Sequence, residues 1–289
     1  MDCIYINLDK AEERRLHVEK NFAAHKKPDW TLTRFPAVDK ILVERNNIGG
    51  AAKPGEKGCF LSHRNLLEQR LGDDKSYLVV EDDAMIGART CALIERVLES
   101  NRDLDWDILF TDVCIPSMPL MFELLKVRRD LCKRNIDVEL MNLRGVEFAG
   151  STAYIVNGKS KRKMHEILSA HKDIDLPYDL YLRQLSHTGV LKIYTLFPFV
   201  TTVSDLSDGS QIKSESINPI ELAWNMFRKM IWTERNLNHS RPALELFRNT
   251  WCRDEPLVKI PGADDELNAF TFLFSSMAAL PQAPGYRNQ

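Results

Sequence analysis

The chain has 289 residues, 44% of them hydrophobic and 28% charged, which is enough for one large globular domain or a domain with an appendage. A formal net charge of −2 argues against a nucleic-acid-binding protein whose affinity rests on bulk positive charge. Six scattered cysteines without a C-x-x-C pair are typical of free thiols in a reducing compartment, rather than of disulfides or a zinc site. No signal peptide is evident, and the longest apolar run, 270–280, is too short to span a bilayer. We therefore expect a cytoplasmic protein, at most peripheral to the inner membrane.

Apolar strands alternate with helices through most of the chain. Strands are expected at 3–8, 30–38, 77–81, 106–112 and 148–156, with one or two more within 190–203. Helices are expected at 11–25, 59–71, 91–99, 121–133 and 159–171, with a short one starting near 177. Asp9 is the expected N-cap of the first helix, and 46–58 reads as a polar, glycine-bearing loop. This alternation predicts an α/β fold with a mixed, mostly parallel sheet.

The end of the chain changes character. Asn218-Pro-Ile-Glu221 is a strong helix start, and apolar stripes predict further helices near 244–251 and 267–277. The sequence thus predicts a sheet domain over 1–212 and a C-terminal helical subdomain over 213–289.

The strand at 77–81 leads into three consecutive acids, Glu81, Asp82 and Asp83. Buried carboxylates must be paired or neutralised, so the strand should end at Glu81 with the acids at its carboxyl edge. In open α/β sheets that edge binds ligands, and clustered hard oxygens suit Mg²⁺ or Mn²⁺. A solvated acidic turn is the alternative.

Several segments together resemble glycosyltransferase family 25. The matching segments are Ile4-Tyr-Ile-Asn-Leu-Asp9, Gly55-Glu-Lys-Gly-Cys-Phe-Leu-Ser-His63 and Val80-Glu-Asp-Asp83, with weaker matches at 150–155, 178–181 and 203–205. The resemblance covers about residues 3–212 and implies a Rossmann-like GT-A fold, a UDP-sugar donor, a divalent cation and inversion at the sugar carbon. It points to galactose from UDP-galactose as the transferred sugar, and to a glycan or glycolipid acceptor such as lipopolysaccharide or lipooligosaccharide.

The resemblance also implies roles for individual residues. Asp83, with Glu81 or Asp82, would hold the cation, and Asp205 or Asp208 would add a ligand unless these two only form a turn. Asp179 is the candidate general base, with an N-cap role as its alternative and Asp112 as the second choice of base. The residues expected to contact the donor are Asn7, Leu8, Arg15, His63, Glu81, Asp82 and Gly150.

Two of these motif residues have simpler readings. For His63 a satisfied helix histidine is the more common role, and Cys59 is expected to be a packing residue because nothing near it supplies an activating base.

Two other functions compete with glycosyl transfer. A nucleotidyltransferase also uses strand-end acids and Mg²⁺, but it usually carries a glycine-rich loop after the first strand, and residues 8–11 contain no glycine. Loss of an acid from the triplet would favour a non-catalytic sugar-binding module on the same fold. All three acids are present, which argues against this alternative.

Two basic clusters predict either peripheral membrane contact or solvated helix faces. They are Lys126, Arg128, Arg129 and Lys133, and Lys159, Lys161, Arg162 and Lys163. The aromatic residues of the C-terminal stripe could add interfacial contact, although buried packing is the more common use of such a stripe.

Overall fold

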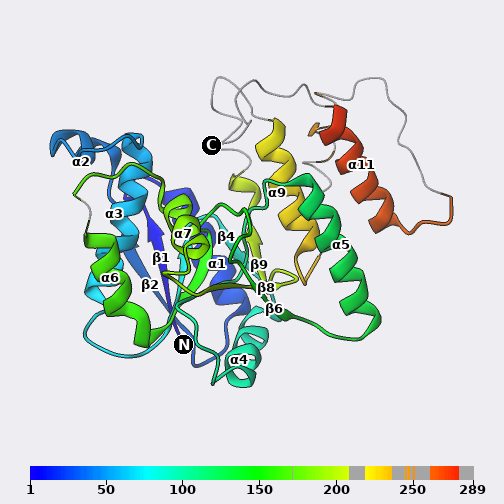
Figure 1. Cartoon of the computed structure of the whole chain (residues 1–289), viewed down its shortest axis with the longest axis horizontal. Coiled ribbons are helices and arrows are strands. Elements are labelled where there is room, and N and C mark those ends of the chain that lie inside the picture. The colour runs from blue at the N-terminus through cyan, green and yellow to red at the C-terminus, as the bar shows by residue number, and fades with distance from the viewer. Residues whose placement is uncertain are drawn as a thin grey trace.

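The structure, a computed structural model, describes residues 1–170, 172–207, 219–235 and 261–279, together with residues 244, 246, 247 and 250. Its centre is a seven-stranded sheet of order β2-β1-β3-β7-β5-β8-β6 (Figure 1). Five strands run in one direction, and β7 and β6 oppose them. The strands are β1 (Asp2–Asn7), β2 (Thr31–Pro36), β3 (Tyr77–Glu81), β5 (Ile108–Phe110), β6 (Glu139–Asn142), β7 (Ala153–Val156) and β8 (Ile193–Phe197). This confirms the predicted mixed, mostly parallel, Rossmann-like α/β class.

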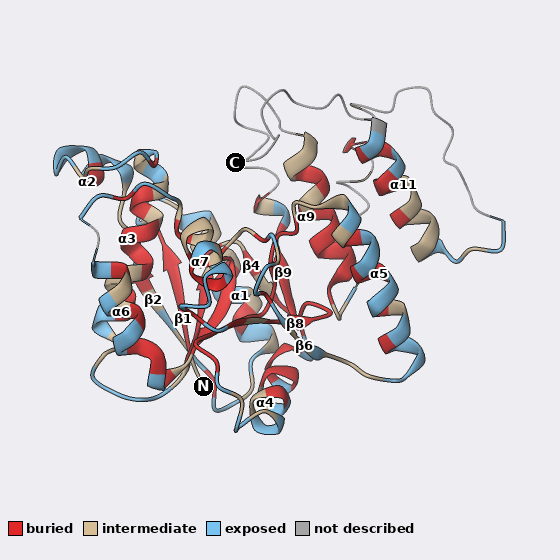
Figure 2. Ribbon diagram, viewed as in Figure 1, coloured by how far each residue is buried: buried red, intermediate tan, exposed pale blue. Residues whose placement is uncertain are grey.

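Helices cover both faces of the sheet because successive strand residues point to opposite sides. In β1, Ile4 and Ile6 join one hydrophobic cluster, whereas Cys3 and Tyr5 join the other. The first cluster packs under α3 (Pro54–Gln69), α6 (Lys161–Ser169) and α7 (Tyr178–His187). The second packs under α1 (Glu12–His25) and α4 (Thr90–Ser100). The inner strands are accordingly buried, whereas the edge strands β2 and β6 and the outer faces of these helices are more exposed (Figure 2).

Three further helices, α5 (Met118–Lys133), α9 (Pro219–Ile231) and α11 (Asp265–Ala279), gather beside the sheet (Figure 1). Their apolar residues belong to the same continuous cluster as α3 and α7. The predicted helix start at 218–221 is confirmed from Pro219 onward. The helix predicted near 244–251 and the boundary predicted between 212 and 213 lie largely outside the described residues, so the two-domain division stays a prediction.

Several local predictions were wrong. Asp9 does not cap α1, because the N-cap position is Ala11 and Asp9 pairs with Arg34. The expected loop at 46–58 holds the start of α3, where Pro54 occupies the first turn and the Glu56 side chain accepts a hydrogen bond from the Lys53 backbone N–H. The elements without a sequence prediction are α2 (Lys40–Arg45), β4 (Ala84–Ile86), β6 and the 3-10 turn η1 (Gly158–Ser160). β4 pairs with β9 (Thr201–Val203) in a separate two-stranded sheet.

The basic clusters are less exposed than the sequence suggested. Arg128 is buried against the Met230 carbonyl and Glu266, and Lys161 is buried against Asp73 and the Arg70 carbonyl. Phe227 and Trp232 are also buried, so these residues of the C-terminal stripe serve packing. No helix in the described part of the chain has the length and apolar character required to cross a bilayer. Peripheral membrane contact stays a prediction that rests on the remaining exposed cations.

Candidate functional site

The carboxyl ends of β1 and β3 bring Asn7 next to the acidic triplet. Parallel pairing sets Ile6 opposite Glu81, so the following residues, Asn7 and Asp82, leave the sheet side by side. The Asn7 amide Nδ2 donates to Asp82 Oδ2 at 2.7 Å, and Arg34 Nε donates to Asn7 Oδ1 at 3.1 Å. Asn7 is therefore a fixed hydrogen-bond donor that orients Asp82, and its predicted contact with a sugar-nucleotide donor stays a prediction.

Arg14 of α1 completes the surroundings of Asp82. Its NH1 donates to Asp82 Oδ1 at 2.8 Å, and its NH2 lies 3.5 Å from Asp83 Oδ2. Burial raises the pKa of Asp82, although Arg14 and Asn7 oppose that shift. Both oxygens of Asp82 are thus engaged by the protein, which leaves Asp82 poorly placed to act as the predicted metal ligand.

Sequence reasoning selected Arg15, but the structure brings its neighbour Arg14 to the triplet. Arg15 pairs with Glu12 at 3.4 Å instead. One feature of the sequence separates the two arginines: Arg14 lies in the same i, i+4 row as Val18 and Phe22, the buried residues of α1. Leu8 contributes its backbone carbonyl, which accepts a hydrogen bond from the Ala11 N–H at 3.0 Å.

Asp83 is the least satisfied acid of the triplet. Its Oδ1 is buried without a hydrogen-bond partner, while its backbone carbonyl accepts from the Ser204 N–H at 2.7 Å. Burial, and then the charge of Glu81, raise the pKa of Asp83 to about 6. An unpaired carboxylate oxygen among other carboxylates is the kind of group that a hard divalent cation satisfies. Asp83 therefore fits the predicted role of cation ligand.

The other predicted metal ligand, Asp205, follows Ser204 but points elsewhere. Its carboxylate accepts from Lys229 Nζ at 2.9 Å, and the side chain is 69% exposed. Asp82, Asp83 and Asp205 do not form a group of described residues whose ligand atoms all lie within 4.8 Å of one another. The predicted trio is therefore not preassembled, and Asp208 lies outside the described residues.

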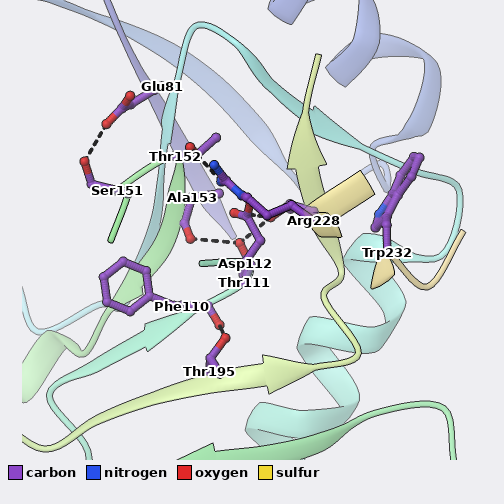
Figure 3. A network of polar contacts seen from close by, with 12 residues as sticks. Glu81, Phe110, Thr111, Asp112, Ser151, Thr152, Ala153, Thr195, Arg228 and Trp232 are labelled. Carbon is purple, nitrogen blue, oxygen red and sulfur yellow. Dashed lines mark hydrogen bonds and ion pairs between the residues drawn. The ribbon is translucent and has the colours of Figure 1, made fainter. Parts of the chain in front are cut away.

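Glu81 turns toward the interior rather than toward Asp82. It accepts a hydrogen bond from the Ser151 hydroxyl (Figure 3), and its Oε1 lies 3.5 Å from His63 Nε2. Burial by itself would raise the pKa of Glu81, but the nearby His63, the Ser151 hydroxyl and the charge of Arg228 hold it below its usual value. His63 is almost fully buried behind Glu81. Since it is shielded there, His63 can reach a donor only through Glu81.

Gly150 and Asp179 meet on the other side of the site. Gly150 has a φ of +82°, a left-handed conformation that favours glycine, and its N–H donates to Asp179 Oδ2 at 2.6 Å. The N-cap position of α7 is Pro177, so Asp179 lies in the first turn and the N-cap alternative is wrong. The half-buried Asp179 is held by the Gly150 loop rather than by its own helix.

A buried arginine from α9 reaches the same region (Figure 3). Arg228 donates through Nε and NH2 to Asp112 Oδ2, and through NH2 to Thr152 Oγ1 at 2.9 Å. Thr201 donates to the other Asp112 oxygen at 3.0 Å. Asp112, the second choice of general base, is thus fully buried in an ion pair and is not free to accept a proton. Sequence reasoning missed Arg228, although a cation adjacent to Phe227 in an apolar stripe is a signal of burial with a partner.

A pocket of about 360 Å³ lies beside α9, the helix that carries Arg228. It is bordered by α1, by β4 and β9, and by α9, through His17, Met85, Thr202, Asp205, Lys229 and Trp232. Pockets that bind small molecules range from about 300 to 1,000 Å³. Asp205 therefore lines a cavity of ligand-binding size, and Met85 of the same cavity follows Asp83 by two residues.

Two comparisons place the chain among known proteins. Residues 1–182 match the model of the family described as glycosyltransferase family 25 (LPS biosynthesis protein). The chain is also similar to the lipooligosaccharide biosynthesis protein lic2B of Haemophilus influenzae, with 24% identity over 176 residues. That similarity covers 57% of this chain and 61% of the relative, so the chain spans less than two thirds of the relative's length.

Proposed function

This chain belongs to glycosyltransferase family 25, and from that membership we propose that it transfers a sugar from a UDP-sugar to a glycan acceptor. The observation that carries the proposal is the state of the acidic triplet. Asp82 is held by Asn7 and Arg14, whereas Asp83 keeps a buried oxygen without a partner at the ligand-binding edge of the sheet. The unpaired carboxylate oxygen at this edge supports the binding of a cation there, and the cation in turn supports the binding of an anionic ligand.

We propose Asp83 as the principal ligand of a divalent cation, Mn²⁺ or Mg²⁺, with Asp82 or Asp205 available only after rearrangement. When bound, such a cation acts as a Lewis acid that neutralises charge on a diphosphate leaving group. The protein contributes the adjacent Arg14 cation and the Asn7 amide, which order the triplet before the donor arrives. A GT-A arrangement of the nucleotide along the ends of β1 and β3 is consistent with these positions.

We propose Asp179 as the general base that accepts the proton of the acceptor hydroxyl. Its carboxylate is held by the Gly150 N–H. The charges of Asp179 and Asp83 both contribute to the raised pKa of the Cys59 thiol, which supports a location of the two acids in the same region of the protein. Direct attack by a hydroxyl that Asp179 deprotonates would invert the configuration at the sugar carbon, because no covalent sugar–enzyme intermediate intervenes.

The acceptor and the sugar are the finer part of the proposal. The relative's printed name concerns lipooligosaccharide biosynthesis, and on that basis we propose a lipooligosaccharide or lipopolysaccharide glycan as acceptor. Galactose from UDP-galactose is the first donor to test. The enzyme would then be a β-galactosyltransferase, provided that the donor is the usual α-linked nucleotide sugar.

Incubation with a panel of UDP-sugars, Mn²⁺ and a truncated lipooligosaccharide acceptor, with UDP release as the readout, tests the proposal. We expect release with one sugar above all, dependent on acceptor and abolished by EDTA. Release of pyrophosphate from UTP and a sugar 1-phosphate would instead indicate a nucleotidyltransferase. Binding of UDP-sugars without turnover, under every acceptor tested, would favour a non-catalytic module.

A further inference from the structure

Cys59 and His63 come together beside Glu81, the first acid of the triplet. Cys59 and His63 are four residues apart on α3, so they share one face of the helix, and Glu81 ends β3 opposite them. Among the described residues, these three have ligand atoms that all lie within 4.8 Å of one another. We propose that they form a metal site for Zn²⁺, separate from the all-oxygen cation site at Asp83.

The spacing of the ligand atoms suits a tetrahedral ion. Zinc lies about 2.0–2.2 Å from nitrogen and oxygen ligands, which places two ligand atoms of a tetrahedron roughly 3.3–3.6 Å apart. His63 Nε2 and Glu81 Oε1 are 3.5 Å apart. The His63 side chain is 1% exposed, and its Nε2 has no hydrogen-bond partner. A buried imidazole nitrogen without a partner is costly, and a metal between it and Glu81 would satisfy both groups.

The second ring nitrogen of His63, Nδ1, has a hydrogen-bond partner, as in most metal-binding histidines. Nδ1 lies 2.7 Å from the Tyr154 hydroxyl, which lies 3.0 Å from the Tyr178 hydroxyl. The ring also stacks on Tyr178, with centroids 4.2 Å apart and planes 3° from parallel. With a metal bound, Nδ1 would donate its proton to Tyr154 and Nε2 would present its lone pair to the ion. Such a bond to the second nitrogen fixes the tautomer and orientation of metal-binding histidines.

The charges around the thiol favour a bound cation. Burial, and then the carboxylates of Glu81, Asp179 and Asp83, raise the pKa of Cys59 well above its usual value, although the Ser151 hydroxyl opposes this. A dication at this cluster would bind the thiolate, with release of the thiol proton to solvent. The positive charge of Arg228 also favours a lower pKa for Glu81 and Asp83, but the guanidinium is paired with Asp112.

The ligand types select the metal. Thiolate and imidazole favour Zn²⁺, whereas an all-oxygen site favours Mg²⁺ or Mn²⁺. Three protein ligands leave a fourth position for water, and the Glu81 side chain, 30% exposed, lies on the open side of the cluster. The spacing of the cysteines alone argued against a zinc site. That spacing could not indicate this cluster, because two of its three ligands are not cysteines and Glu81 comes from a different element.

Cobalt substitution tests the site without any activity assay. Chelator-treated protein titrated with Co²⁺ should develop a near-ultraviolet thiolate-to-cobalt charge-transfer band and tetrahedral visible bands, saturating at one ion per chain. Competition with Zn²⁺ then measures zinc affinity. Cys59→Ser should abolish the charge-transfer band. Tyr154→Phe, which removes the hydroxyl that contacts Nδ1 and Tyr178 but no metal ligand, should weaken zinc binding about 10–100-fold while the band persists.

Two control variants separate this site from other thiols and from the donor cation. Cys132→Ser removes an exposed thiol outside the cluster, and Asp83→Asn removes the proposed donor-cation ligand. Both should keep the charge-transfer band. Absence of the band in the wild-type protein, its persistence in Cys59→Ser, or its loss in Asp83→Asn would each overturn the proposal, whatever the result of the UDP-release assay.

Discussion

Arg228 is expected to be one of the most stability-critical residues of the protein. It lies in α9, beyond the residues 1–182 matched by the family, yet its guanidinium ties that helix to Asp112 after β5 and Thr152 before β7. The side chains of Arg228 and Asp112 are 5% and 0% exposed. Removal of one partner from such a pair leaves the other charge buried and uncompensated, which costs about 3–5 kcal/mol.

We therefore predict that Arg228→Met lowers the free energy of unfolding by about 3–5 kcal/mol, measured by urea unfolding followed by tryptophan fluorescence. Arg235→Met is the matched control, because Arg235 lies just after the same helix and pairs with Glu266 at 2.7 Å, but it is 39% exposed. Its loss should cost no more than about 1 kcal/mol.

A double-mutant cycle separates the ion pair from simple packing. Asp112→Asn combined with Arg228→Met leaves no unpaired charge, so it should destabilise the protein by clearly less than the sum of the two single changes. Additive effects, or a loss in Arg228→Met no larger than in Arg235→Met, would show that the pair does not anchor α9 as described.

Four other predictions concern the candidate site and the surface. Asp83→Asn should abolish transfer, yet in EDTA at pH 8 it should raise the free energy of unfolding by up to about 3 kcal/mol, because burial raises the pKa of Asp83 to about 6 and the folded state disfavours its charge. Below the unfolded pKa the wild-type carboxyl is protonated in both states, so this advantage should fade as pH falls from 6 to 4; a constant difference in urea midpoint would contradict it. Asp179→Asn should lower kcat about 10²-fold or more with little change in donor affinity, and near wild-type turnover would remove Asp179 from the base role. Arg14→Met should weaken UDP-sugar binding in calorimetry more than Arg15→Met does, since Arg14 contacts the triplet and Arg15 contacts Glu12; equal effects would refute that assignment. Flotation with anionic vesicles should show salt-sensitive binding that charge reversal at the exposed Lys126 and Lys133 reduces, whereas protein left wholly in the soluble fraction at low salt would exclude this contact.

Local pattern was sufficient to predict most of the helices and strands, although not α2, β4, β6 or η1. The run of apolar residues at 77–80 followed by three acids predicted a buried strand ending at Glu81, and β3 has those bounds. Asn218-Pro-Ile-Glu221 predicted the start of α9 from capping chemistry. These predictions depend on neighbours within one or two turns of chain, which the sequence displays directly. Asp9 failed as a cap because Arg34, distant in sequence, pairs with its carboxylate instead.

The roles within the site depended on contacts between residues far apart in the chain. All three acids of the triplet looked alike in sequence, but Asn7 and Arg14 hold Asp82, Ser151 and His63 hold Glu81, and Asp83 alone keeps a buried oxygen without a partner among the described residues. Likewise, Asp112 became part of an ion pair only because α9 packs beside the sheet and brings Arg228 to it. The sequence by itself determined which residues are acids at a strand end; the packing of distant elements decided which acid is paired, because burial and partner charges set the cost of leaving each one free.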